Sequence, residues 1–109
     1  MLKPYLLDTH ILLWWLTDDP RLTPKLAQLL QNPNNLIYTS SANFWEISIK
    51  HSLGKLKLQV SLSEIISATP FPNLSIKQDH ISQLDQLPPI HKDPFDRILI
   101  AQSIAENAM

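Results

Sequence analysis

Short β-type segments alternate with helical segments along the whole chain. The residues at 5–8, 36–40 and 74–77 are apolar or β-branched and are bounded by proline, asparagine or polar turns, which is typical of short strands. Apolar residues at helical spacing predict helices at 9–17, 23–32, 41–53, 61–67, 78–87 and 93–107. This alternation indicates an α/β domain in which helices cover a parallel sheet.

Residues that favour helix starts support this assignment. In two of the predicted helices a proline stands at the first helical position, where its missing N–H costs nothing. The residue before each proline carries an oxygen that can accept a backbone hydrogen bond. The expected N-terminal caps are Thr9, Thr23, Ser41, Ser61 and Asp93.

Composition excludes several classes of protein. With one glycine in 109 residues the chain has no glycine-rich phosphate loop, which excludes P-loop and dinucleotide-binding sites. It has no cysteine, so disulfides and thiolate metal sites are excluded, and we expect a cytoplasmic protein. No apolar run approaches the ~20 residues of a membrane span, and the first residues do not resemble a signal peptide. We expect one domain, spanning 1–109.

Four acidic residues lie where a parallel sheet would bring them together. Asp8 ends the first strand segment, and the carboxyl ends of parallel strands share one edge of the sheet. Glu46 interrupts an apolar helical face, and Asp93 and Asp96 begin the last helix.

Each acid also has an ordinary explanation. Asp8 and Asp93 suit N-caps, and Glu46 suits a surface position at the edge of the apolar stripe. Asp96 could pair with its neighbour Arg97. Taken together, four carboxylates without clustered histidine or cysteine favour Mg²⁺ or Mn²⁺.

A basic stretch and the tryptophans are further candidates. The net charge of −1 gives no overall attraction to nucleic acid, so such a partner needs a local patch. Trp14, Trp15 and Trp45 suit a core, but two adjacent tryptophans cannot both face inward from one helix, so one of them could mark a partner surface. The basic residues that form either a phosphate track or a solvated face are Lys50, His51, Lys55, Lys57, Lys92 and Arg97.

Three segments, taken in order, resemble the PIN domain. They are "LLDTHILLWWL" at 6–16, "SSANFWEISIK" at 40–50 and "LPPIHKDPFDRILIAQ" at 87–102. The nearest branch resembles the VapC-type toxin ribonucleases of bacterial toxin–antitoxin systems. The resemblance implies a three-layer fold and an endoribonuclease that depends on Mg²⁺ or Mn²⁺. It also implies a homodimer that a cognate antitoxin holds inactive.

The motifs of this family assign roles to particular residues. The resemblance implies that Asp8 in "LLDT", Glu46 in "FWEI" and Asp96 in "FDRILIA" hold the metal, with Asp93 close by as a fourth catalytic candidate. Two hydroxyl positions that orient the metal or the first acid would be Thr9 and Ser40.

The sequence departs from the family pattern at its end. In such proteins a further strand and a Thr-x-Asp type motif with a fourth acid follow the last helix. This sequence stops at Asn107-Ala108-Met109, so we expect a PIN-like sheet without the last strand and with strand one as an exposed edge.

Two other functions stay open. A catalytically impaired module would keep the fold, dimerise and bind an antitoxin without cutting RNA. An aspartyl-phosphate enzyme could use Asp8, but "DTH" lacks the second aspartate that such phosphatases place two residues on.

Overall fold

Three short parallel strands and six helices make up the described part of the chain. The computed structural model describes residues 3–89 and 93–108. The strands are β1 (Lys3–Leu6), β2 (Asn35–Ser40) and β3 (Asn73–Leu74), in the order β1-β2-β3. The helices are α1 (Thr9–Leu16), α2 (Pro24–Gln31), α3 (Ser41–Ser52), α4 (Leu62–Ala68), α5 (Gln78–Leu84) and α6 (Pro94–Ala105).

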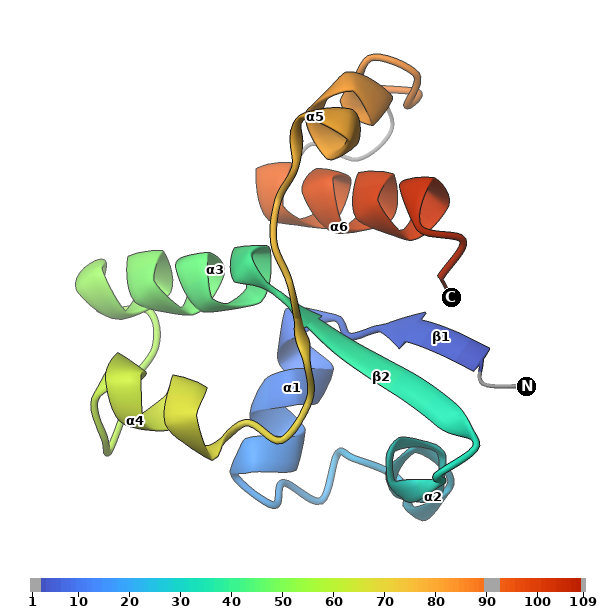
Figure 1. Ribbon diagram of the computed structural model, residues 1–109. Coiled ribbons are helices and arrows are strands. Elements are labelled where there is room, and N and C mark those ends of the chain that lie inside the picture. The colour runs from blue at the N-terminus through green and yellow to red at the C-terminus, as the bar shows by residue number, and fades with distance from the viewer. Residues whose placement is uncertain (1–2, 90–92, 109) are drawn as a thin grey trace.

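Helices cover the sheet on both faces, which confirms the predicted α/β class. Figure 1 shows α5 and α6 on one side of β1 and β2, α1 and α2 on the other, and α3 leading away from the carboxyl end of β2. Both strand pairs are parallel, with Tyr5 opposite Ile37 and Thr39 opposite Asn73. Of the helices in 3–89 and 93–108, none is long and apolar enough to cross a membrane.

Each face of the sheet packs against its own apolar cluster. Leu7 and Ile37 point toward α1, α2 and α4, where their cluster also includes Leu12. Leu6 points the other way and packs against Ile98 on α6 and its neighbours. Successive residues of extended chain face opposite sides, so Leu6 at the end of β1 and Leu7 directly after it supply the two clusters.

Two helices are capped one residue before the first cap expected for them, and for α1 this confirms the capping interpretation of Asp8. Asp8, not Thr9, caps α1, because its carboxylate accepts a hydrogen bond from the His10 N–H at 2.9 Å. Ser40, not Ser41, caps α3, because its hydroxyl accepts from the backbone N–H of residue 42 at 3.0 Å. Thr23, Ser61 and Asp93 cap α2, α4 and α6 as predicted.

Two strands differ from the prediction: β1 has the predicted length but is shifted by two residues, and β3 is shorter. β1 ends at Leu6, and Asp8 has already turned to cap α1, so Asp8 lies beyond the strand instead of ending it. β3 keeps only two residues of pairing. After it, the Ser75 carbonyl accepts from the Gln102 side chain, and the Lys77 N–H donates to the His80 ring at the start of α5.

Three helices end in the same way, with a residue of positive φ just past the last turn. These residues are Asp18 after α1, Gly54 after α3 and Asn107 after α6. After α3, the N–H of Gly54 donates to the His51 carbonyl and that of Lys55 to the Lys50 carbonyl. This paired arrangement satisfies carbonyls that would otherwise lack partners at the helix end and fixes the direction of the following chain.

We expect Leu12→Ala to lower the free energy of unfolding by about 2–5 kcal/mol, because Leu12 is fully buried in the cluster beneath the sheet. The control is Ile81→Ala, whose side chain is 52% exposed and which should change stability by less than about 0.5 kcal/mol. Urea unfolding followed by circular dichroism measures both. Equal losses for the two variants would contradict this packing.

Candidate active site

The four predicted acids gather at the carboxyl edge of the sheet. Asp8 lies between β1 and α1, Glu46 in the second turn of α3, and Asp93 and Asp96 at the start of α6. Asp8 and Asp96 line the same hollow, whose volume is about 290 Å³. Burial raises the pKa of Asp96 above its ordinary value of 3.8, and the charges of Asp93, Asp8 and Glu46 raise it further. Segments distant in sequence thus form one acidic site.

Glu46 is the most deeply buried of these acids. Its side chain is 3% exposed, and its Oε2 lies 2.6 Å from the Nζ of Lys50, one helical turn later. This hydrogen bond is the main reason that the pKa of Lys50 is raised, and the charges of Asp93 and Asp96 add to it. Lys50 is therefore a counter-charge built into the acidic site.

Asp8 and Asp93 each combine a cap with a place in the site. The Asp8 carboxylate is 45% exposed, and one of its oxygens lies 3.1 Å from the His10 Nδ1. The Asp93 carboxylate accepts from the N–H groups of Phe95 and Asp96 at 2.8 and 3.2 Å. The capping and site interpretations are therefore compatible for both residues.

A buried amide, Asn43, joins the two strand–helix junctions that carry the site. Its Nδ2 donates to the Leu7 carbonyl at 3.1 Å and to the Thr9 hydroxyl at 2.9 Å, on either side of Asp8. Its Oδ1 accepts from the Ser40 N–H at 2.7 Å. The amide is fully buried and fixes the backbone around Asp8 relative to α3.

The two predicted hydroxyl residues are buried behind the acids. Thr9 contacts Asn43, as above, and is 3% exposed. Ser40 donates through its hydroxyl to the Gln102 Oε1 at 2.6 Å and is fully buried. Both hydroxyls are committed to bonds that hold the junctions together, so these residues support the site from within the fold.

The carboxylates fit a divalent cation in charge and in donor type. Hard oxygen donors suit Mg²⁺ or Mn²⁺, and the pKa of Asp96 is raised first by burial and then by the charges of Asp93, Asp8 and Glu46. In the part of the chain that the structure describes, however, no three His, Asp or Glu side chains stand ready to hold an ion. Glu46 is turned to Lys50, which its Oε2 contacts.

The basic candidates divide into separate groups. Lys50, Lys55 and Lys57 line a hollow beside α1, and His51 is exposed outside it. Arg97 donates to the carbonyls of Leu84 and Pro88 between α5 and α6. Lys92 lies outside the described residues.

The three tryptophans have three different surroundings. Trp15 packs in the core against Phe71, at 5.5 Å between ring centroids. Trp14 lines the hollow beside α1, so the adjacent pair is divided as predicted. Trp45 is 55% exposed and meets the edge of Phe95, so its prediction as a core residue was wrong.

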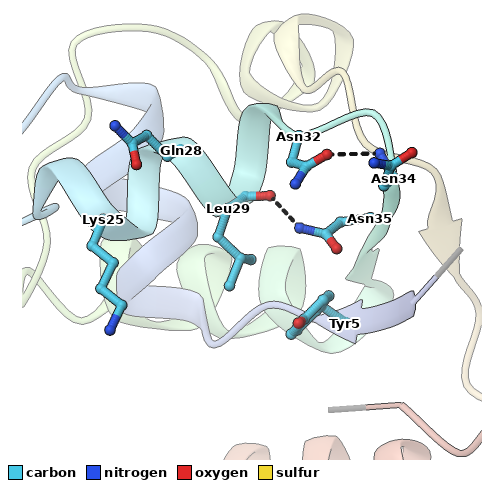
Figure 2. A pocket seen from close by; sticks show the side chains of 7 residues that line it. All are labelled: Tyr5, Lys25, Gln28, Leu29, Asn32, Asn34 and Asn35. Atoms are coloured by element: carbon cyan, nitrogen blue, oxygen red, sulfur yellow. Dashed lines mark hydrogen bonds between the residues drawn. The ribbon is translucent and has the colours of Figure 1, made fainter.

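A second hollow, of about 520 Å³, lies near the start of β2. Figure 2 shows that it is lined by Tyr5 and by residues of α2 and the loop that follows, including Lys25. Two of its amides hold the backbone: Asn35 donates to the Leu29 carbonyl, and Asn32 accepts from the Asn34 N–H. No acid lines this hollow among the described residues, which leaves the carboxylate site as the better candidate for catalysis.

Comparison with protein families gives one match. The model of the PIN domain matches residues 5–109. Comparison with curated proteins and with solved structures gave no match. The matched span includes all four acids and Asn43.

Sequence reasoning missed three features of the site: the pairing of Lys50 with Glu46, the contact of His10 with Asp8 and the buried amide of Asn43. The Glu46–Lys50 pair has the i, i+4 spacing of a helical ion pair, so it was detectable. His10 lies two residues after Asp8, within reach of its carboxylate. Asn43 stands at the third helical position, where a side chain can bond back to the cap, but an asparagine there gives no further signal.

We expect Asn43→Ala to lower the free energy of unfolding by about 2 kcal/mol or more, because it leaves buried groups at Leu7, Thr9 and Ser40 without partners. Asn73→Ala is the matched control, since Asn73 makes one exposed hydrogen bond to Ser41 and should cost less than about 1 kcal/mol. Urea unfolding measures both variants. A loss at residue 43 no larger than at residue 73 would show that the amide does not join the junctions.

Proposed function

The chain belongs to the PIN domain family, whose members are generally metal-dependent nucleases, and from this premise we propose that it is an endoribonuclease that uses Mg²⁺ or Mn²⁺. The observation that carries the proposal is the gathering of Asp8, Glu46, Asp93 and Asp96 at one edge of the sheet. RNA is the proposed substrate, with hydrolysis of its phosphodiester bonds as the reaction.

Each residue of the site has a distinct part in this proposal. Asp8, Glu46 and Asp96 would hold the ion, with Asp93 adding negative charge beside Asp96 and capping α6. The bound ion would lower the pKa of a water molecule and stabilise charge on the phosphoryl group. Asn43 keeps Asp8 in place through the backbone on either side of it.

Hydrolysis by water is in keeping with the residues present. The chain has no cysteine. The hydroxyls of Ser40 and Thr9 are buried, and each forms a hydrogen bond with another side chain. In-line attack by water would leave a 5′-phosphate and a 3′-hydroxyl. Lys50 neutralises Glu46 while the site holds no ion.

The likeness to VapC-type toxins extends the proposal to regulation. We infer that the protein is cytoplasmic, forms a homodimer and is held inactive by a cognate antitoxin. The three sequence segments that resemble this branch support the inference. Co-purification with the product of a neighbouring gene, followed by loss of RNA cleavage in the complex, would test it.

A binding module without catalysis is the second candidate. Two observations favour it: Lys50 already occupies Glu46, and no three described side chains stand ready to hold an ion. Such a module would keep the PIN fold and its partner surfaces. It would bind Mn²⁺ only at millimolar concentration or not at all.

We expect Asp8→Asn to lower Mn²⁺-dependent cleavage of a generic RNA by about a hundredfold or more, because it removes one charged ligand. Asparagine caps helices as well as aspartate, so the fold should be unchanged by circular dichroism. The control is Asp79→Asn, an exposed acid in the first turn of α5. If Asp8→Asn protein cuts RNA as fast as the parent, the assignment of Asp8 is wrong.

We also expect Mn²⁺ to raise the thermal midpoint of the parent protein, since a ligand that binds the folded state stabilises it by about 2.7 kcal/mol at a hundred times its Kd. The rise should be much smaller in Asp96→Asn and unchanged in Asp79→Asn. Differential scanning calorimetry with and without Mn²⁺ measures it. A parent that shows no rise at submillimolar Mn²⁺ would favour the binding module instead.

A further inference from the structure

A groove leads away from the acidic site along α1. It is about 440 Å³ in volume and lies between α1 and the connection from α3 to α4. Its inner end is lined by neighbours of the acids: Thr9 and His10 directly follow Asp8, and Lys50 is paired with Glu46. We call it the α1 groove, and the residues that define it are His10, Trp14, Lys50, Lys55, Lys57 and Leu58.

The groove continues beyond this first hollow. A neighbouring hollow of about 400 Å³ shares Leu13, Thr17, Lys57 and Leu58 with it. The depression is therefore elongated, and it runs from the carboxylates along the length of α1. An elongated track that begins at a reactive site suits a polymer better than a compact ligand.

Free positive charge lies along the outer part of the α1 groove. Lys55 and Lys57 are exposed, and within the described residues neither ammonium group makes a hydrogen bond or an ion pair. Of the described residues that line the groove, only Asp19 is acidic, and it is bound to Arg21 at 2.8 Å. The groove thus attracts anions although the chain as a whole is slightly negative.

The other component of the groove is apolar and aromatic. Leu13, Leu56 and Leu58 lie beside the charged residues. The Arg21 guanidinium lies over the Trp14 ring, 5.3 Å from its centroid, and the His10 ring lies beside it, with the two ring centroids 6.5 Å apart. Cations that follow a phosphate backbone, combined with aromatic and apolar surface for bases, are the two components of sites for single-stranded nucleic acid.

The fold fixes the position of both walls of the groove. Helix α3 ends in a turn at Gly54, whose φ is +74°, and in this turn the Lys55 N–H donates to the Lys50 carbonyl. The corresponding turn at Asp18 ends α1 and directs the chain toward Asp19 and Arg21. Both walls of the groove therefore begin at fixed helix ends.

We propose that the α1 groove binds the single-stranded segment of RNA next to the phosphodiester that is cut, with phosphates on Lys55 and Lys57 and a base against Trp14. This proposal rests on the proposed ribonuclease function. It specifies unpaired RNA, because a duplex keeps its base faces stacked and out of reach of an aromatic wall. A negatively charged peptide is the competing occupant that the experiment must separate from RNA.

The test is the salt dependence of binding to a labelled single-stranded RNA, measured by fluorescence anisotropy on the full chain in EDTA. A gel confirms that the RNA stays intact. For single strands the logarithm of the binding constant falls by about 0.7 per phosphate contact for each unit of log salt. The variant Lys55→Gln/Lys57→Gln should therefore lower this slope by about 1.4 and weaken binding at low salt at least tenfold.

Two further variants separate charge from stacking. Lys25→Gln, an exposed lysine of α2 outside the groove, should leave the slope and the affinity unchanged. Trp14→Leu should weaken binding about tenfold with an unchanged slope, because stacking involves no counterion release. Circular dichroism verifies the fold of each variant.

Several outcomes would overturn the inference. They are an unchanged slope in Lys55→Gln/Lys57→Gln, equal affinity for duplex and single-stranded RNA, and displacement of the RNA by poly-glutamate at a lower concentration than by unlabelled RNA. The proposed function has a separate readout, since it fails when Asp8→Asn protein still cuts RNA. Groove binding measured in EDTA is independent of that result.

Discussion

The buried amide of Asn43 is the contact on which the candidate site depends. With three hydrogen bonds it joins the chain before and after Asp8 to the N-terminus of α3. Pairing with β2 continues through the Leu7 N–H, which donates to the Tyr38 carbonyl at 3.0 Å, and the Asn43 amide takes over from there. Asn43 thus fixes the position of Asp8 relative to α3, the helix that carries Glu46.

The fold brings several negatively charged side chains close together, and their charge is offset in two ways. Helix N-termini accept Asp8 and Asp93 as caps, where backbone N–H groups offset the negative charge. Lys50 neutralises Glu46 inside the fold. Burial raises the pKa of Asp96, and the charges of Asp93, Asp8 and Glu46 raise it further.

The elements were predictable from sequence because apolar spacing and proline positions determine them locally. Thr23-Pro24 and Asp93-Pro94 begin α2 and α6 as predicted. The adjacent oxygen-bearing residues at 40 and 41 could not be distinguished, since either can cap a helix and the choice depends on the Asn43 and Gln102 contacts. The gathering of the acids followed from topology, whereas the exposure of Trp45 follows from how α3 projects past the sheet and was not predictable from spacing.

The cap at residue 8 has an evolutionary consequence. Helix α1 needs an oxygen acceptor there, and asparagine, serine and aspartate meet that need about equally. Protein stability therefore exerts almost no selection for a negative charge at this position. In a lineage that had lost the reaction, neutral drift would soon replace the aspartate. A carboxylate that is kept at this position across descendants therefore indicates selection for the reaction.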